Sequence, residues 1–285
     1  MVCVIVNPHA GDGQAAERLP GVEAALRAHG LRFRVERTTS IEHARELARS
    51  ALAAGEVAAA MGGDGLAGAV AHELQGTDGT LGVIPGGRGN DWARKLAITE
   101  ANAVDVIAAG VTRMVDVAQA DGRTYLGIAS AGIDSDVQVI ANATRLPLGG
   151  QVYVYGTLRA LTRWKPARWS VTLDGTPRAF DGYSVAVCNS GVFGGGMHLV
   201  PDASVQDGLL DVVFIEHASR RHYLLNLVKV FRGTHVHDVA YTRVQAREVA
   251  FSADRPFTAY ADGDPIADLP ATFRVLPGAL RVLAP

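Results

Sequence analysis

Residues 57–91 read VAAAMGGDGLAGAVAHELQGTDGTLGVIPGGRGND. Two short apolar runs in this stretch, Val57–Met61 and Leu81–Ile84, each end in a glycine-rich loop that leads into a helical pattern. Compact runs of β-branched and small apolar residues are typical of buried parallel strands. An open α/β sheet binds its ligands at the carboxyl ends of such strands. The stretch therefore predicts an α/β sheet with a ligand site at the two glycine loops.

The two loops have the chemistry of a phosphate site. The first is Gly62–Gly68 and the second is Pro85–Asp91, and each carries an aspartate. Amides and the helix dipole favour phosphate at a helix N-terminus, and a missing Cβ lets it approach the backbone. A tight turn between strand and helix explains either loop alone equally well. Two such loops, each with a carboxylate that suits Mg²⁺, favour the phosphate site.

The rest of the N-terminal part continues the alternation of strand and helix. Further strands are expected at Val2–Val6 and Phe33–Glu36, and Ser40 is placed to cap a helix over Ile41–Leu52. This alternation predicts a doubly wound α/β layer with right-handed crossovers. The loop Asn7–Gly13 fits the dinucleotide-binding pattern only weakly, because its glycines do not follow the first strand directly.

The pattern changes near residue 115. Asp-Gly pairs between strand-like runs, at Asp121-Gly122 and Asp174-Gly175, are strong hairpin signals. Helical patterns occur near Gln151–Trp164 and Ser219–Phe231. Many short strands at this spacing predict an antiparallel sandwich or barrel. The expected strands are Met114–Ala120, Thr124–Ser130, Trp169–Leu173, Thr176–Phe180, Tyr183–Val187, Leu209–Ile215, Val249–Ala253, Phe257–Ala261, Thr272–Leu276 and Leu280–Leu283.

Composition excludes several classes of protein. A chain of 285 residues has room for about two domains, and its formal net charge of −2 gives no electrostatic footprint for nucleic acid. Cys3 and Cys188 lie in apolar runs without a CxxC motif, so we expect buried free thiols and no structural zinc. No apolar run is long enough for a membrane span, and Met1–Asn7 is too short for a signal peptide. A cytoplasmic protein is therefore expected.

Several motifs follow one another in a specific order. The first half holds Asn7-Pro8 with Gly11, Gly62-Gly63-Asp64-Gly65, and Gly89-Asn90-Asp91 with Ala93-Arg94. The second half holds Gly191–Gly196, Pro201, Asp207-Gly208-Leu209-Leu210-Asp211 and Asp262-Gly263-Asp264. This set resembles the diacylglycerol kinase catalytic family, which includes bacterial soluble lipid kinases and the sphingosine and ceramide kinases. The resemblance covers nearly the whole chain. It implies an ATP-binding α/β domain over residues 1–115 and a β-sandwich lipid-substrate domain over residues 116–285.

The resemblance also implies an activity and a nucleotide site. The activity is transfer of phosphate from ATP, with Mg²⁺, to the hydroxyl of diacylglycerol or a similar lipid. Asp262 would be the general base, with Asp264 beside it in place of the family's usual Glu. Without the resemblance, a hairpin turn explains Asp262-Gly263 better. The residues implied to bind ATP are Asn7, Pro8, His9, Ala10, Gly11, Asp12, Gly13, Thr39, Gly62, Gly63, Asp64, Gly65, Leu66, Ala67, Gly68, Arg88, Gly89 and Asn90.

Two metal sites are implied in the same way. A Mg²⁺–water network near the phosphates would be held by Asp64, Asp91 and Asp116. A structural Mg²⁺ would lie in a later loop, although a plain turn explains that loop equally well from the sequence alone. The residues implied to hold this second ion are Ser204, Asp207 and Leu209.

Two positions depart from the family pattern. Leu66 and Arg88 each stand where the family usually has a threonine. Both changes remove a hydroxyl from the expected nucleotide site. Arg88 could compensate by pairing with phosphate, because a guanidinium suits that geometry. Equally, the changes could mark another nucleotide, another acceptor or lost activity.

A basic segment without acidic residues lies between Asp136 and Asp174. Cations beside aromatic rings suit an anionic membrane interface, so this segment is a candidate for lipid entry at the inner face of the membrane. A helix packed over the sandwich edge is the alternative. The segment holds Arg145, Tyr153, Tyr155, Arg159, Arg163, Trp164, Lys165, Arg168 and Trp169. A second basic stretch, Arg220–Arg232, could add to the same face, but its Leu224, Leu225, Val228 and Phe231 are expected in the core.

Other functions stay open. A soluble-substrate kinase of the NAD kinase type shares the Gly-Gly-Asp-Gly element, and a non-catalytic nucleotide- or lipid-binding regulator would fit the departures at Leu66 and Arg88. A dinucleotide oxidoreductase is the weakest alternative. Oligomeric state is also open, because a sheet edge or an apolar face could form a homodimer.

Overall fold

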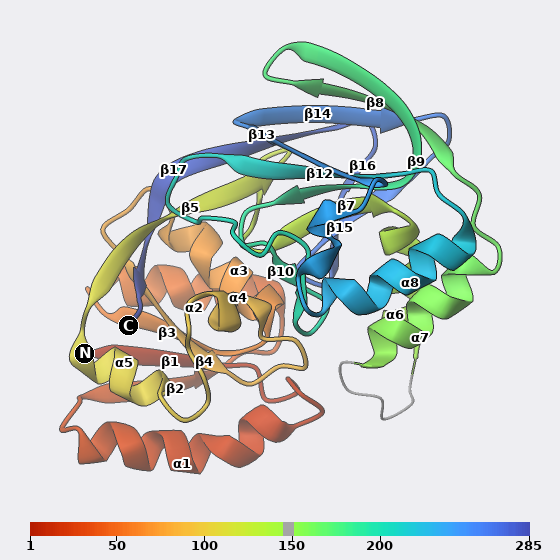
Figure 1. Ribbon diagram of the computed structural model, residues 1–285. Helices are drawn as coiled ribbons and strands as arrows, with labels where there is room; N and C mark the ends of the chain where they lie inside the picture. The colour runs from red at the N-terminus through yellow and green to blue at the C-terminus, as the bar shows by residue number, and fades with distance from the viewer. Residues whose placement is uncertain (145–150) are drawn as a thin grey trace. The chain divides into compact units, whose positions relative to one another are not determined.

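The computed structural model describes residues 1–144 and 151–285 (Figure 1). The chain folds as unit 1 (Met1–Val117 with Pro277–Pro285) and unit 2 (Ala118–Leu276). The predicted fold class is confirmed, because unit 1 is an α/β domain and unit 2 is an antiparallel β-sandwich. Within the described ranges, no helix is both long and apolar enough to cross a membrane.

The C-terminus belongs to a different unit from the one that the sequence suggested. The sequence predicted a domain boundary near residue 115, with all later residues in the second domain. The structure instead places Pro277–Pro285 in unit 1. The last strand pairs in parallel with a strand of unit 1, through Arg281 with Thr80 and Val282 with Leu81. A pairing between residues so far apart in the chain leaves no local signal in the sequence.

Unit 1 is built on four parallel strands in the order β2-β1-β3-β4. Helix α1 packs with α5, and α2 packs with α3 on the opposite face of the sheet, as right-handed crossovers require (Figure 1). Ser40 caps α2 as expected, because its Oγ accepts a hydrogen bond from the His43 amide at 3.0 Å. The elements are β1 (Val2–Val6), α1 (Gln14–Ala28), β2 (Phe33–Arg37), α2 (Ile41–Ala53), β3 (Val57–Gly62), α3 (Asp64–Leu74), β4 (Thr80–Pro85), α4 (Asp91–Lys95) and α5 (Ala103–Ala109).

Among its described residues, unit 2 has two large antiparallel sheets that share β9, and a separate two-stranded sheet of β10 and β11. One large sheet has the order β13-β12-β9-β7-β15-β16 and the other the order β9-β8-β14-β17, because the two halves of β9 pair in different sheets. Strands β5 and β17 have residues in both units. The strands are β5 (Thr112–Ala120), β6 (Arg123–Tyr125), β7 (Ile128–Gly132), β8 (Ala167–Leu173), β9 (Thr176–Cys188), β10 (Val192–Phe193), β11 (Met197–His198), β12 (Leu210–Glu216), β13 (Tyr241–Ala246), β14 (Glu248–Ala253), β15 (Thr258–Ala261), β16 (Asp264–Asp268) and β17 (Ala271–Leu283).

Aromatic side chains fill the space between the two sheets. Trp169, Phe251 and Phe273 are all buried there, and the rings of Phe251 and Phe273 stack at 4.8 Å. Cys3 in β1 and Cys188 in β9 are buried free cysteines, as expected. Burial raises the pKa of Cys3 to about 11, so its thiol stays protonated at neutral pH.

The Asp-Gly pairs form the predicted hairpin turns. Asp121 and Gly122 have φ of 47° and 81°, and Asp174 and Gly175 have φ of 46° and 85°. Two successive residues with positive φ are the signature of the type I′ turn, whose twist matches that of the paired strands. The sequence was informative here because the turn chemistry is local.

Several strand predictions were wrong in their extent. Thr176–Phe180 and Tyr183–Val187 are parts of the single strand β9, because that strand continues through Asp181-Gly182 from one sheet to the other. Thr272–Leu276 and Leu280–Leu283 are likewise parts of β17. Their local interruptions do not end a strand that has partners along both halves.

Three helices pack side by side on unit 2 (Figure 1). They share an apolar cluster that includes Ile133, Leu161 and Trp164, with Tyr223 and Leu224 packed against it. The sequence predicted the second and third helices but not the first, which follows directly on β7. Their bounds are α6 (Ile133–Ala143), α7 (Val152–Leu161) and α8 (Arg220–Val230), and a short 3-10 helix, η2 (Thr234–His237), follows α8.

Asp134 is a carboxylic acid in the first turn of α6. Desolvation raises its pKa to about 6, and the nearby Ser184 side chain opposes the rise. Burial raises the pKa of Tyr223 in α8 well above its usual value, and the nearby Asp134 charge adds to the rise. Since the folded state holds this proton more tightly than the unfolded chain does, ionisation of Asp134 opposes folding.

Replacing Asp134 should therefore change how stability depends on pH. The contribution of this group to folding is complete below the unfolded pKa and is lost as pH rises through about 6. We expect Asp134→Asn to be more stable than the wild type at pH 8, by up to about 3 kcal/mol, with the gain shrinking toward pH 4. Urea unfolding across this range measures it. Asn at the exposed Asp78 is the matched control, and equal pH profiles for all three proteins would contradict the assignment.

Candidate active site

Three loops meet at the carboxyl ends of adjacent strands of unit 1. They follow β1, β3 and β4, and they are the loops at Asn7–Gly13, Gly62–Asp64 and Gly86–Asp91. The Gly86 amide donates to the Gly62 carbonyl at 2.8 Å, so the second and third loops are joined through their backbones. The structure thus brings together the two loops in which the sequence predicted a phosphate site and the Asn7–Gly13 loop that the family resemblance adds to the ATP-binding residues.

Glycine is required where these loops touch. A Cβ on Gly87 would lie 2.4 Å from the Gly63 Cα, and a Cβ on Gly11 would lie 2.7 Å from the Gly86 carbonyl oxygen. Both distances are far below van der Waals contact with backbone atoms that cannot easily move. The loops therefore pack backbone against backbone, which leaves main-chain groups rather than side chains to form this edge of the sheet.

Asp64 joins the second loop to the third. Its carboxylate accepts hydrogen bonds from the Asp91 amide at 3.1 Å and the Trp92 amide at 2.9 Å, and so stabilises the N-terminus of α4. Desolvation raises the pKa of Asp64, and these amides and Arg94 oppose that rise. A Cβ on Gly89 would lie 3.1 Å from a carboxylate oxygen of Asp64 and 3.3 Å from one of Asp91, so the two carboxylates flank the same glycine.

Arg88 forms an ion pair with Asp12 across the first and third loops. Its Nη2 and Nε donate to the two carboxylate oxygens at 2.6 and 3.3 Å. Both side chains are largely exposed, and the Arg88 hydrogen bond lowers the pKa of Asp12. Arg88 therefore reaches the loop edge, where the sequence suggested that it could pair with phosphate.

The remaining predicted ATP-binding residues differ in exposure. Leu66, Ala67 and Gly68 are buried in the first turns of α3, and the Leu66 side chain packs over Gly62. Thr39 is exposed beyond β2, with its Oγ1 3.1 Å from the His43 ring. In the first loop the Asn7 side chain accepts from the His9 amide at 3.0 Å. Leu66 thus takes the place of the family's hydroxyl with a side chain that faces the interior.

The predicted Mg²⁺ ligands are only partly brought together. Asp64 and Asp91 lie side by side, and the Asp91 carboxylate also forms an ion pair with Arg94 at 2.7 Å. Asp116 is buried on β5, where it accepts from the Gly278 amide at 2.7 Å. No group of three histidine, cysteine or acidic residues suited to a metal occurs among residues 1–144 and 151–285. Two neighbouring carboxylates suit a hydrated Mg²⁺ better than a fully protein-coordinated ion.

The loop implied to hold a structural Mg²⁺ has the hydrogen bonds of a turn. Asp207 accepts from the Leu209 amide at 3.1 Å and from Gln245 at 3.3 Å, and Ser204 accepts from the Gln206 amide at 3.1 Å. The plain turn left open by the sequence therefore accounts for the geometry of Asp207, and any bound cation would find one carboxylate there.

Asp262 occupies the first position of a hairpin turn between β15 and β16. Asp262 and Gly263 have φ of 52° and 98°, so the hairpin turn expected from the sequence is present. The carboxylate nevertheless extends out of the turn and accepts from the Leu126 amide at 2.8 Å and the Gly127 amide at 3.0 Å. These amides interrupt the strand expected over Thr124–Ser130, because the chain turns its N–H groups toward Asp262 instead of a strand partner.

Asp174 provides an internal comparison for Asp262. It has the same turn position, and its carboxylate likewise accepts backbone hydrogen bonds, from Arg247 and Glu248 at 2.8–3.2 Å. Binding two amides is therefore not in itself a catalytic feature. Asp264, the predicted neighbour of Asp262, begins β16, and partial burial raises its pKa although Arg123 opposes the rise.

Asn189 and Ser190 complete the surroundings of Asp262 and were not predicted. Both are fully buried, and both backbone amides donate to the Gly127 carbonyl, at 2.9 and 3.2 Å. The Asn189 side chain also donates to the Leu126 carbonyl at 2.9 Å. These bonds fix the two residues whose amides hold Asp262. Their only sequence signal is a pair of polar residues directly after the apolar run of β9.

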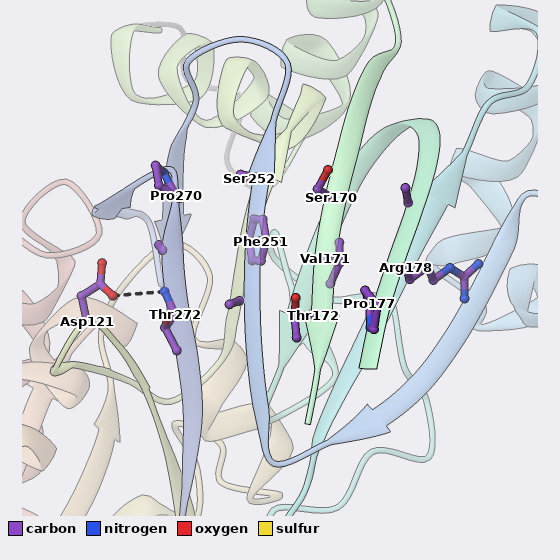
Figure 2. Close-up of a pocket in the computed structure, with 13 residues that line it drawn as sticks. Asp121, Ser170, Val171, Thr172, Pro177, Arg178, Phe251, Ser252, Pro270 and Thr272 are labelled. Atoms are coloured by element: carbon purple, nitrogen blue, oxygen red, sulfur yellow. Dashed lines mark hydrogen bonds between the residues drawn. The ribbon is translucent and has the colours of Figure 1, made fainter. Parts of the chain in front are cut away.

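A shallow pocket on unit 2 is lined by none of the predicted site residues (Figure 2). Its volume is about 600 Å³, and its lining includes small polar side chains such as Ser170, Thr172 and Ser252. The Asp121 carboxylate at its border accepts a hydrogen bond from the Thr272 amide at 3.1 Å. The pocket offers no paired titratable groups for chemistry, so the loops above are the candidate site.

The basic segment is only partly a surface feature. Trp164 and Trp169 are buried in unit 2, so these rings belong to its core, as the alternative interpretation held. Arg159, Arg163 and Lys165 are exposed on α7 and just beyond it. Arg145 lies outside the described residues.

Comparison with known proteins identifies the class. Residues 1–120 match the diacylglycerol kinase catalytic domain family, and residues 127–284 match the YegS C-terminal NAD kinase beta sandwich-like domain family. A Mycobacterium tuberculosis protein named diacylglycerol kinase is 34% identical over 297 residues, which cover 100% of this chain and 95% of that protein. A Bacillus subtilis (strain 168) protein of the same name is 28% identical, with 99% and 95% covered.

A solved structure shares the fold. The crystal structure of a diacylglycerol kinase from Bacillus anthracis str. Sterne aligns with a TM-score of 0.78 at 21% identity, covering 100% of this chain and 96% of that chain. An α/β domain with glycine loops followed by a β-sandwich, together with these matches, defines an enzyme of the lipid kinase class. The chain belongs to the diacylglycerol kinase family.

Closing the space between the glycine loops should cost stability. Gly87→Ala would force its Cβ to 2.4 Å from Gly63, so we expect the free energy of unfolding to fall by about 1–3 kcal/mol. Gly21→Ala is the matched control, because Gly21 lies in α1 with open space around its Cβ and should gain about 0.5–1 kcal/mol. Chemical denaturation measures both. A Gly87→Ala protein as stable as the wild type would mean that the loops do not approach as closely as described.

Proposed function

We propose that this lipid kinase transfers the γ-phosphate of ATP, with Mg²⁺, to the hydroxyl of diacylglycerol or a similar lipid, giving phosphatidic acid or its analogue. The observation that carries the proposal is the backbone packing of three loops at the carboxyl ends of β1, β3 and β4. Such an edge offers amides and two acidic groups to a polyphosphate while keeping side chains out of its way. Relatives named diacylglycerol kinase support the choice of acceptor.

Arg88 is the proposed side-chain contact to the ATP phosphates. Its guanidinium already lies at the loop edge, paired with Asp12. A phosphate group would compete with the Asp12 carboxylate for the same donors, since both accept a planar guanidinium in two-point geometry. Asp12 would then hold Arg88 in place before ATP arrives and would weaken ATP binding by the same interaction.

Asp64 and Asp91 are the proposed partners of Mg²⁺. Amides and Arg94 occupy part of the acceptor capacity of these carboxylates, which suits hydrogen bonding to metal-bound water. When bound, the ion would neutralise charge on the transferred phosphate. Asp116 is a further candidate, and the turn at Ser204, Asp207 and Leu209 is proposed for the second, structural ion.

Asp262 is the proposed general base. The lipid hydroxyl oxygen would bond to the γ-phosphorus as the bond from that phosphorus to the β–γ bridging oxygen breaks, and ADP would leave. The hydroxyl proton would pass to Asp262, whose two amide bonds fix the carboxylate in one orientation. Asp264, at the start of the next strand, would add negative charge beside it.

A membrane-bound substrate implies contact with a membrane. We extend the proposal to a cytoplasmic enzyme that works at the inner face of the membrane in phospholipid synthesis. The cations Arg159, Arg163 and Lys165, with Leu158 half-exposed beside them, favour an anionic surface near α7.

Transfer of labelled phosphate tests the reaction. Purified protein with Mg²⁺ and γ-labelled ATP should transfer label to diacylglycerol in mixed micelles, and EDTA should abolish transfer. Label on another lipid would keep the mechanism and change the substrate, and label on NAD would identify an NAD kinase-like enzyme. ATP binding without transfer to any acceptor would indicate a regulator, as Leu66 and Arg88 suggested. Tight NAD(P)H binding would instead favour an oxidoreductase.

Asp262→Asn should lower turnover by about 10²–10⁴-fold, the usual range for a missing general base. The variant also places an amide NH₂ group where the carboxylate accepts backbone hydrogen bonds, so some stability will be lost. Asp174→Asn is the matched control, because it makes the same change in the same kind of turn, at a carboxylate that also accepts from two backbone amides. If Asp174→Asn reduced turnover as much as Asp262→Asn, the role of Asp262 would be structural.

If Asp12 and phosphate compete for Arg88, substitutions of Arg88 and of Asp12 should change the KM for ATP in opposite directions. Arg88→Ala should raise the KM for ATP about tenfold, because a charge-assisted contact to phosphate is lost. Asp12→Asn should lower that KM a few-fold, because it frees the guanidinium and removes a negative charge. Steady-state kinetics at saturating lipid would measure both. A rise in KM in both variants would show that the pair only clamps the two loops.

A further inference from the structure

Helix α8 exposes apolar side chains that the sequence assigned to the core. Leu225 is 61% exposed and Val228 is 65% exposed, and Phe231 at the helix end is 37% exposed. Leu224 alone of the four expected core residues packs against the apolar cluster of unit 2. The correction has a simple cause: α8 has apolar residues all around it, and the sequence does not say which of them face the protein.

The opposite face of α8 already satisfies its packing against unit 2. Tyr223, Leu227 and Val230 are half-buried, and the Tyr223 ring lies 4.8 Å from that of Tyr183. His222 also holds the helix, through a 2.7 Å hydrogen bond between its Nε2 and the Asp238 carboxylate. The exposed apolar residues are therefore not needed to attach the helix. A surface helix with an unused apolar stripe is typical of an interaction site.

Cations frame the exposed apolar residues. Arg221, Leu225, Val228 and Arg232 follow one another at spacings of about one helical turn, and Lys229 lies beside them. These five residues, all exposed, are termed the α8 outer face. No aspartate or glutamate occurs from residue 217 to residue 237. A stripe with apolar residues at its centre and cations at its ends complements a surface that is anionic outside and apolar just beneath.

We propose that the α8 outer face docks on an anionic lipid bilayer, with Leu225 and Val228 entering the headgroup region and Arg221, Lys229 and Arg232 contacting lipid phosphates. Amphipathic helices bind membranes in this way, through buried apolar area and attraction to anionic lipids. Another soluble protein would have to supply an acidic, apolar groove, whereas a bilayer supplies both features along the length of the helix.

The N-terminus of α8 lies close to the cations that follow α7. Arg220, at the first turn of α8, donates a hydrogen bond to the Trp164 carbonyl at 3.0 Å, so the N-terminus of α8 lies next to Arg163 and Lys165. This docking proposal rests on the proposed function, because it assumes that the lipid substrate lies in a bilayer. Binding to a bilayer is nevertheless measurable without any turnover.

Vesicle sedimentation without ATP or diacylglycerol tests the proposal. Wild-type protein should sediment with vesicles of equal parts phosphatidylglycerol and phosphatidylcholine, and much less with pure phosphatidylcholine. L225S/V228S should weaken binding at least about tenfold, because apolar contact is lost. R221Q/K229Q/R232Q should weaken it by about five-fold per cation, on the order of 100-fold. R163E/K165E tests, in the same assay, how much the two cations that follow α7 contribute to vesicle binding.

Matched variants separate docking from general effects. I41S/V111S removes exposed apolar residues elsewhere, and R32Q/R247Q/R274Q removes the same charge from other exposed positions. Both should sediment like the wild type. Wild-type binding in L225S/V228S would overturn the proposal. So would a wild-type dimer that this variant converts to monomer in size-exclusion chromatography, because the face would then be an interface between two copies. Since no phosphate transfer is measured, failure of docking and failure of the proposed reaction are distinguishable.

Discussion

The contact between Gly63 and Gly87 is the constraint on which the candidate nucleotide site depends. Because Gly87 has no Cβ, two βα loops come close enough to join by the Gly86–Gly62 hydrogen bond, and the carboxylate of Asp64 can then cap the helix of the neighbouring loop. Each step needs the previous one, because a side chain at the contact would hold the loops apart. The result is an edge made of backbone amides with two adjacent carboxylates, which is suited to phosphate.

A second principle recurs in unit 2, where aspartates at hairpin turns bind backbone amides of other strands. Asp121, Asp174 and Asp262 all do so, and each has a positive φ. A carboxylate accepts such bonds strongly and ties a turn to a distant segment. Of these turns, the one at Asp262 also adjoins buried polar residues, Asn189 and Ser190, whose amides hold the same loop. The family resemblance singles out Asp262, and the structure explains how its orientation is fixed.

The sequence predicted most strands and both Asp-Gly hairpins, because alternation, glycine and turn chemistry are local properties. It could not predict that β9 and β17 continue through apparent breaks, that the end of β17 returns to unit 1, or that α6 follows β7. Those features depend on partners far away in the chain. The environments of predicted site residues depend on distant partners too. Leu66 is buried, and the Asp64 carboxylate accepts a hydrogen bond from a backbone amide of α4.

Glycine placement and motif order are local properties of the chain, so the fold class, the family and the loops of the candidate site could all be predicted from the sequence. Which groups meet in those loops depends on contacts between distant residues. The tertiary structure paired Arg88 with Asp12, turned the amides of Leu126 and Gly127 toward Asp262, and left Leu225 and Val228 in solvent. The physical reason is that a side chain's environment is set by the element packed against it, and that element is chosen by long-range contacts rather than by neighbouring residues.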